Sequence, residues 1–195
     1  MSGISSFDEL EREIERTKYE FYSESGKNTF FKKQQKFDCA KHIVDKISLE
    51  SLLNRTCYAI PDTNMVHIDY TILKTFASPE IFDTICDYII NTFTHIKGQY
   101  GVLEVALNFD GFTVSAAERY KELIKVFCNH CFKNNTDFAI TITRFMIYNS
   151  PNVIDNIKHI VLPFMEENLK PKVIVIAKND SEPFRQLYAK YGIGV

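Results

Sequence analysis

The stretch "RFMIYNSPNVIDNIKHIVLPFMEENLKPKVIVI", residues 144–176, decides the fold because it predicts a strand, a helix and a second strand. β-branched and aromatic residues fill both ends. Between them, Ser150 can cap a helix and Pro151 suits its first position. Apolar residues then recur at helical spacing up to a second proline, Pro163, which removes a backbone donor and weakens the last turn. Two strands joined by a helix in this way form a βαβ unit with parallel strands.

The same alternation of strands and helices extends upstream and downstream of this stretch. "TCYAIPDTNMVHI", residues 56–68, predicts a hairpin with a turn at "PDTN". Further strands are predicted at 101–109, 137–148 and 172–177, and helices at 69–77, 78–96, 115–132 and 181–192. The predicted fold class is α/β, with a single mixed, largely parallel β-sheet covered by helices.

Residues 1–54 form a predicted N-terminal helical segment, and residues 55–195 form the predicted α/β domain. The segment contains a charged helix at 5–22 and one or two helices at 30–54. A basic and aromatic cluster opens the second part, made of Phe30, Phe31, Lys32, Lys33, Lys36 and Phe37. We interpret it as a solvated helix face with aromatic anchors in the core. Contact with acidic phospholipid headgroups or RNA is the alternative.

Composition restricts the class of protein. Hydrophobic residues make up 45% and charged residues 25% of the 195 residues, which is typical of a globular domain with a core. The net charge of -2 does not favour nucleic acid, and no apolar run is long enough to span a bilayer. The N-terminal residues do not resemble a secretory signal, and the five cysteines do not suggest disulfides. We therefore expect a cytoplasmic protein.

Sequence motifs of catalysis and cofactor binding are absent. The seven glycines form neither a dinucleotide-binding nor a phosphate-binding loop, and no nucleophile elbow is present. We expect that the protein is not an enzyme and has no cofactor. Cysteines and histidines with metal-like spacing occur at Cys39, His42, Cys128, His130 and Cys131. The helical position of Cys128 and Cys131 favours small core residues over zinc ligands, so we expect no metal site.

Four short motifs, in order, resemble the CRAL-TRIO domain of the Sec14 lipid-binding family. They are "NFDGF" at 108–112, "IYNSP" at 147–151, "PFM" at 163–165 and "KPKVIVI" at 170–176. The hairpin at 56–68 resembles the first hairpin of that family. The resemblance covers roughly residues 55–178 and identifies the chain as similar to a divergent member.

The resemblance implies a lipid-binding or lipid-transfer protein, in which the helix from Pro151 acts as a gate over an apolar pocket. It implies as partners a hydrophobic ligand, with phospholipid as the leading candidate, and a transient membrane surface, without nucleic acid. Peripheral attachment to membranes is thus expected beside the cytoplasmic location. The implied ligand-binding residues are Leu103, Val105, Leu107, Phe145, Ile147, Ile157, Val161, Phe164 and Lys172.

The chain also departs from the family pattern. Positions that contact a choline headgroup in some members fall at Leu103 and Val105, which does not support phosphatidylcholine. Of the threonine and lysine that bind inositol phosphate, the threonine falls at Leu169 and only Lys172 has a match. An alternative is a protein-interaction module whose cavity is filled by side chains, either a small-GTPase-binding or a STAS-like regulatory domain. In that case Phe109, Phe145 and Phe164 fill the pocket and the partner is a protein.

Overall fold

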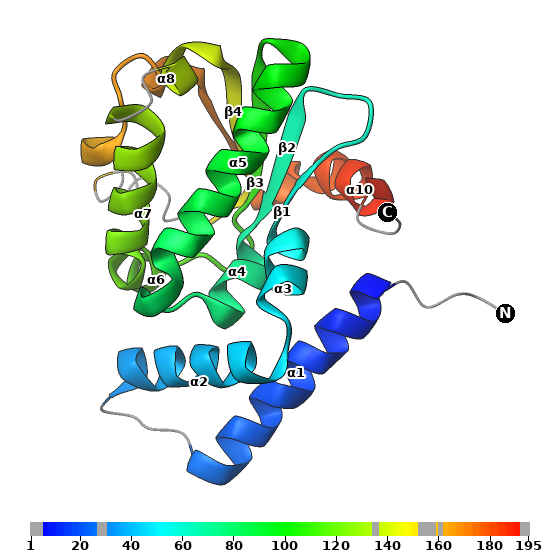
Figure 1. Ribbon diagram of the computed structural model, residues 1–195, viewed down its shortest axis with the longest axis vertical. Coiled ribbons are helices and arrows are strands. Elements are labelled where there is room, and N and C mark those ends of the chain that lie inside the picture. The colour runs from blue at the N-terminus through cyan, green and yellow to red at the C-terminus, as the bar shows by residue number, and fades with distance from the viewer. Residues whose placement is uncertain (1–5, 27–30, 134–136, 152–158, 160–161, 192–195) are drawn as a thin grey trace, which may run out of the picture.

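The computed structural model describes the chain except residues 1–5, 27–30, 134–136, 152–158, 160–161 and 192–195 (Figure 1). Within the described residues, five strands form one sheet in the order β1-β2-β3-β4-β5. The strands are β1 (Cys57–Ala59), β2 (Met65–Asp69), β3 (Leu103–Asn108), β4 (Ile142–Ser150) and β5 (Val173–Ala177). β1 pairs with β2 in antiparallel fashion, and the other neighbours are parallel. The predicted mixed, largely parallel α/β sheet is confirmed.

Helices precede the sheet, connect its strands and follow it. The α-helices are α1 (Ser6–Ser25), α2 (Lys32–Lys46), α3 (Leu49–Thr56), α4 (Tyr70–Phe76), α5 (Phe82–Tyr100), α6 (Val114–Arg119), α7 (Lys121–Cys128), α8 (Asp137–Thr141) and α10 (Glu182–Tyr191). The 3₁₀ helices are η1 (Pro79–Ile81), η3 (Leu162–Phe164), η4 (Lys170–Lys172) and η5 (Lys178–Asp180), and η2 (Asn129–Lys133) is a short π-helix. Among the residues that the structure describes, no helix is long and apolar enough to cross a membrane.

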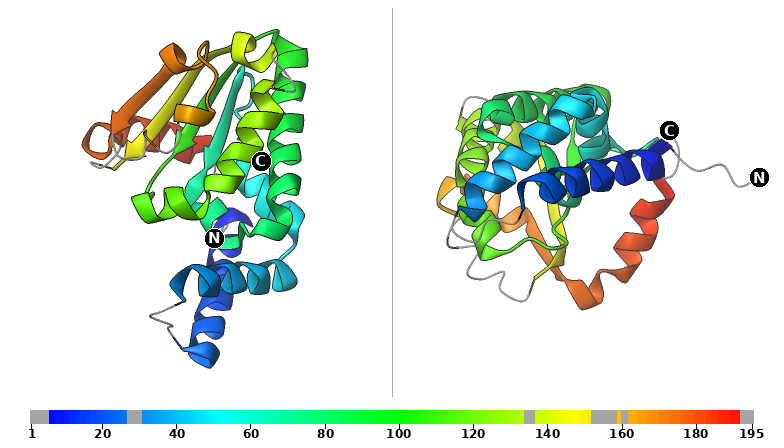
Figure 2. Two further views of the ribbon diagram at one scale, coloured as in Figure 1. Left: turned by 90° about the vertical axis from the view of Figure 1, so that its left-hand side faces the viewer. Right: turned by 90° about the horizontal axis from the view of Figure 1, so that it is seen from below.

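The strand order places the connecting helices on one face of the sheet. Crossovers between parallel strands are right-handed in nearly all proteins, and here the sheet grows in one direction from β2 to β5. Figures 1 and 2 show α5 and α7 together on one face, whereas α10 lies against the other. α1 and α2 lie at the end of the molecule near α4 and α6 (Figure 1).

The N-terminal helices share the main core with the sheet. Ile14 of α1, Ile43 of α2 and Leu52 of α3 are fully buried in the same cluster as Val105 of β3. Within this cluster, Phe37 of α2 makes edge-to-face ring contacts with Phe82 of α5 and with Tyr120, which lies between α6 and α7. The division of the chain at residue 54 stays a prediction, because this packing joins the two parts without testing either part alone.

The first part of the strand predicted at 137–148 is wrong. Residues Asp137–Thr141 form the short helix α8, and β4 begins at Ile142. Phe138 and Ala139 are both buried, although neighbouring residues of a strand point to opposite faces. The Phe138 ring packs edge to face on Phe93 of α5, with 5.8 Å between centroids. Packing of two consecutive side chains therefore overrides the β-branched composition of this segment.

The helix predicted at 115–132 is interrupted. α6 ends at Arg119 and α7 begins at Lys121, with Tyr120 between them in a non-helical conformation, φ −98° and ψ 13°. The Tyr120 hydroxyl donates a hydrogen bond of 3.1 Å to the Lys74 carbonyl of α4. This contact fixes the change of direction between α6 and α7.

The sheet face under α10 is closed by aromatic side chains around a buried histidine. His67 of β2 shares a hydrogen bond of 2.7 Å between its Nε2 and the Tyr148 hydroxyl of β4. Its ring centroid lies 4.9 Å from those of Tyr58 and Tyr188. Burial lowers the pKa of His67 to about 4, opposed by Asp69 and assisted by Arg55. His67 is therefore neutral at physiological pH.

We expect the buried histidine to make stability depend on pH. An unfolded histidine titrates near pH 6.5, so between pH 6.5 and about 4 the unfolded chain binds a proton that folded His67 does not. Acidification through this window should lower the free energy of unfolding by up to about 3 kcal/mol, with full stability above pH 6.5. Urea unfolding at a series of pH values measures this loss.

The double variant His67→Phe/Tyr148→Phe removes both partners of the hydrogen bond and should show a flatter pH dependence. Tyr148→Phe alone retains the imidazole and serves as the control, so it should keep the wild-type slope. The same slope in both variants would contradict the assignment of this titration to His67.

Candidate functional site

A cavity of about 560 Å³ lies between the sheet and the helices α5 and α7. Its described lining consists of Ile68, Tyr70, Leu73, Ile85, Cys86, Ile89, Leu107, Phe109, Phe112, Tyr120, Leu123, Ile124, Phe127, Cys128, Phe145, Ile147, Met165, Leu169, Lys170, Val173 and Val175. Nearly all of these side chains are apolar. The volume lies within the range of about 300–1,000 Å³ that is usual for small-molecule sites.

Two features of the fold leave this space open. Alternation along the parallel strands points Leu107, Ile147 and Val175 to the same face, and these residues lie in register on β3, β4 and β5. Above that face α5 packs on β1, β2 and β3, whereas α7 packs mainly on α5. The space beneath α7 and over β4 and β5 is therefore not filled by either of these two helices.

The wall of the cavity is almost free of charge. Burial raises the pKa of the Cys86 thiol to about 12 and also raises the pKa of Tyr70 and Tyr120. These groups are therefore neutral at physiological pH. Lys170 is the charged member of the described lining, and its Nζ is paired with Glu167. Such a wall favours an apolar guest over a charged one.

The structure brings together part of the set of residues predicted for ligand binding. Leu107, Phe145 and Ile147 line the cavity. Leu103 and Val105 lie on the same face of β3 but are fully buried in the core, outside the described lining. Alternation along β3 identified the correct face, whereas the depth of each residue beneath the helices was not visible in the sequence.

Phe164 and Lys172, the two remaining described residues of the predicted ligand-binding set, do not belong to the cavity lining. Phe164, in η3, is half-buried and packs on the main core cluster beside the lining residue Met165. Lys172 instead holds η4 to α8, since its Nζ donates hydrogen bonds of 2.7 and 3.0 Å to the carbonyls of Ala139 and Ile140. Ile157 and Val161, with most of the predicted gate helix, lie outside the described residues.

The helical half of the lining could not be recognised from the sequence. Ile85, Cys86 and Ile89 of α5 line the cavity together with Leu123, Ile124, Phe127 and Cys128 of α7. Their helical spacing predicted only that they are buried. The available signal was an apolar stripe that is wider than packing against one neighbouring element requires. Such a stripe does not distinguish a residue in the core from a residue in a cavity wall.

Metal binding finds no support within the described parts of the chain, where no group of three or more His, Cys, Asp or Glu residues is placed to hold an ion. Cys39 is buried on α2 next to Tyr22, and Cys128 lies in the cavity wall.

A second hollow, of about 480 Å³ between α1 and α2, is bordered by polar residues such as Gln34, Gln35 and Asp38.

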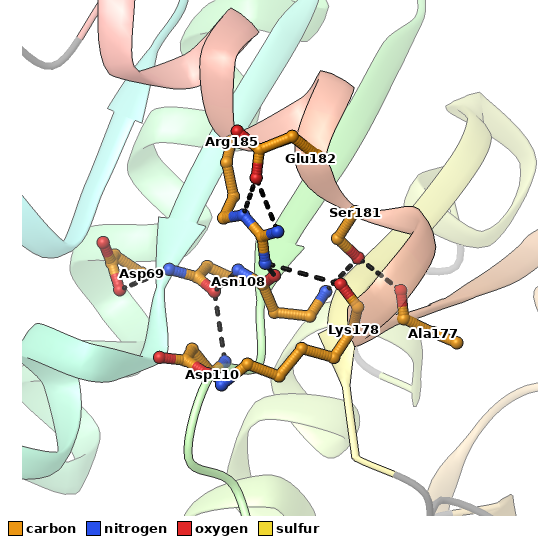
Figure 3. Close-up of polar contacts among 9 residues, drawn as sticks. Asp69, Asn108, Asp110, Ala177, Lys178, Ser181, Glu182 and Arg185 are labelled. Carbon is orange, nitrogen blue, oxygen red and sulfur yellow. Dashed lines mark hydrogen bonds and ion pairs between the residues drawn. The ribbon is translucent and has the colours of Figure 1, made fainter.

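A polar network joins the carboxyl ends of the parallel strands to α10 (Figure 3). Asn149 of β4 is its centre: its Nδ2 donates to Asn108 Oδ1 at 2.9 Å, and its Oδ1 accepts from Arg185 Nη1 at 2.8 Å. The Asn149 backbone N–H donates to Ser181 Oγ at 2.8 Å. Asn108 Nδ2 donates in turn to Asp69 Oδ1 at 3.3 Å. Ligands of open α/β sheets bind at this edge, but here the side chains bond to one another.

The polar network also includes charged side chains of α1, α3 and α10. Asp69 Oδ2 lies 3.5 Å from Arg55 Nη1, and Arg55 Nη2 donates to Glu11 of α1 at 2.8 Å. At the other end, Arg185 Nε and Nη2 both donate to Glu182. The polar network therefore ties α1, the strand ends and α10 together and is structural in character.

No protein-family model and no curated protein sequence matches this chain. Among solved structures the chain is similar to the crystal structure of Sfh5, a Sec14-like protein, with a TM-score of 0.50 and 15% sequence identity. The match covers 92% of this chain and 69% of the Sfh5 chain. At this identity the similarity shows the fold alone, and it agrees with the α/β architecture of a Sec14-like protein.

Asn149 provides a test of the polar network, because its φ of 54° lies in the left-handed region. Asn149→Ala should lower the free energy of unfolding by about 3 kcal/mol, through lost hydrogen bonds and a strained backbone. Asn149→Gly loses the same bonds but accepts the backbone angle, so we expect a smaller loss. Urea unfolding of both variants gives the order, and a glycine variant less stable than the alanine variant would contradict it.

Proposed function

We propose that the protein binds a lipid, a phospholipid or another hydrophobic molecule of similar character, with its apolar part inside the cavity. The observation that carries the proposal is the neutral, apolar space of about 560 Å³ between β3, β4, β5 and α7. Filling such a space removes apolar surface of the guest from water, at about 25 cal/mol for each Å². The similarity of the fold to a Sec14-like protein and the resemblance in the sequence motifs support the same proposal.

A binding role fits the chemistry of the cavity better than catalysis does. The described lining has no charged side chain except the paired Lys170, and Cys86, Tyr70 and Tyr120 are neutral because burial raises the pKa of each. General acid-base catalysis requires a group whose pKa lies near the working pH. We therefore propose a lipid-binding protein that is not an enzyme.

The protein-interaction alternative requires a cavity filled by aromatic side chains. Phe109 and Phe145 lie in the wall of the cavity, and Phe164 packs on the core beside it. The Phe109 ring stacks on Phe112 with 4.2 Å between centroids, which keeps it against the wall. Because these rings leave about 560 Å³ empty, the cavity favours a bound small molecule.

A larger side chain at Ile147 should block ligand binding. Ile147 is half-buried on β4 and lines the cavity, so Ile147→Trp places an indole ring in the space proposed for the guest. Overpacking costs about 1–3 kcal/mol, so we expect the affinity for a phospholipid with a fluorescent acyl chain to fall about tenfold or more. A fluorescence titration measures it.

Ile174→Trp is the matched control, because Ile174 on the neighbouring strand points to the opposite face and is 45% exposed. Its affinity should equal that of the wild type. Equal affinities of Ile147→Trp and Ile174→Trp would show that the labelled lipid binds elsewhere.

A further inference from the structure

Three cations from separate helices converge where α2, α4 and α6 meet. They are Lys36 of α2, Lys74 of α4 and Arg119 at the end of α6. α2 packs on α4, and the Phe37 ring lies 6.3 Å from the Tyr120 ring. The bond from the Tyr120 hydroxyl to the Lys74 carbonyl closes the arrangement at 3.1 Å. Lys36 directly precedes Phe37, Arg119 directly precedes Tyr120, and Lys74 itself accepts the bond. The fold therefore brings the three cations to the same region.

The charges at this place are not compensated. The pKa of Lys36 is lowered, first by burial and then by nearby charges, all of which are positive. Those charges belong to Arg119, Lys32, Lys18 and Lys74. Lys18 is paired with Glu15 at 2.9 Å. Across the described parts of the chain, Lys32, Lys36, Lys74 and Arg119 form no ion pair.

Aromatic rings, and not carboxylates, position two of these cations. The Lys74 Nζ lies 5.6 Å from the centroid of the Tyr70 ring, and the Arg119 Cζ lies 5.6 Å from that of Tyr120. Arg119 Nε is buried and has no hydrogen-bond partner among the described residues. Tyr70 and Tyr120 also line the cavity, so these two cations contact rings that form part of its wall. Holding like charges together without a counter-charge is unfavourable, and a bound anion relieves it.

We propose that Lys32, Lys36, Lys74 and Arg119 form a binding site for a phosphate-bearing anion, which we call the cation cluster. Phosphate oxygens accept hydrogen bonds from several Lys and Arg side chains at once. A phospholipid headgroup in a membrane and a free phosphate share this chemistry. The headgroup is favoured by Phe31, which directly precedes Lys32 in the chain and is 71% exposed. Exposed aromatic rings beside lysines are typical of surfaces that enter the membrane interface.

The test uses the full chain and the double variant Lys36→Gln/Lys74→Gln, which removes two charges and retains polar side chains. The matched control is Lys46→Gln/Lys125→Gln. It removes the same charge from exposed positions on α2 and α7 that do not belong to the cation cluster. Co-sedimentation is measured with vesicles of equal parts phosphatidylserine and phosphatidylcholine, and with vesicles of phosphatidylcholine alone.

We expect the wild type and the control to bind the phosphatidylserine vesicles, and the cluster variant to bind about 30-fold more weakly. Titration with inorganic phosphate distinguishes the sources. Vesicle binding that phosphate does not compete away assigns the site to a membrane headgroup. Saturable binding of phosphate itself, lost in the cluster variant but not in the control, assigns it to a free phosphate group.

The proposal is overturned if the cluster variant and the control bind vesicles and phosphate equally, or if the wild type binds neither. Variant-dependent binding of an RNA oligonucleotide alone would also overturn it. Uptake of a fluorescent fatty acid added without vesicles should be the same in all three proteins. Failure of the anion site is therefore distinguishable from failure of the proposed cavity function.

Discussion

The order of the parallel strands is the constraint on which the rest of the structure depends. Because β2, β3, β4 and β5 follow one another without reversal, right-handed crossovers place the described helices α5 and α7 on one face. That face must accommodate both α5 and α7. α5 occupies the part over β1 to β3, and α7 packs on α5, farther from the strands. The cavity over β4 and β5 is thus a consequence of topology and helix packing.

The opposite face meets a different requirement, because α5 and α7 leave it uncovered. α10 supplies Tyr188 and Phe184 against Tyr148, and the buried His67 lies among these rings. The polar network around Asn149 fixes α10 to the ends of the strands. One face of the sheet therefore carries the aromatic cluster beneath α10 and is tied at its edge, while the other borders the apolar cavity. This asymmetry is what a rigid scaffold with a binding cavity requires.

Sequence patterns predicted the elements well and the cavity only in part. The hairpin, β3 and β5 followed from alternation and turn residues, because these signals are local. Ile140 and Thr141 made α8 look like a strand, and only the packing of Phe138 on Phe93 decides otherwise. The separation of Leu107 in the cavity wall from Leu103 and Val105 in the core depends on the distance between α7 and the strands. That distance is set by tertiary packing, and no pattern in a single sequence predicts it.

The central claim is that the apolar space beneath α7 holds a hydrophobic guest. Native mass spectrometry of the protein, purified without detergent and compared with the same sample after denaturation, tests it most directly. The account predicts a folded species heavier than the chain by the mass of one lipid, which organic extraction recovers. A folded protein with the mass of the chain alone, both as purified and after incubation with phospholipid vesicles, would contradict it.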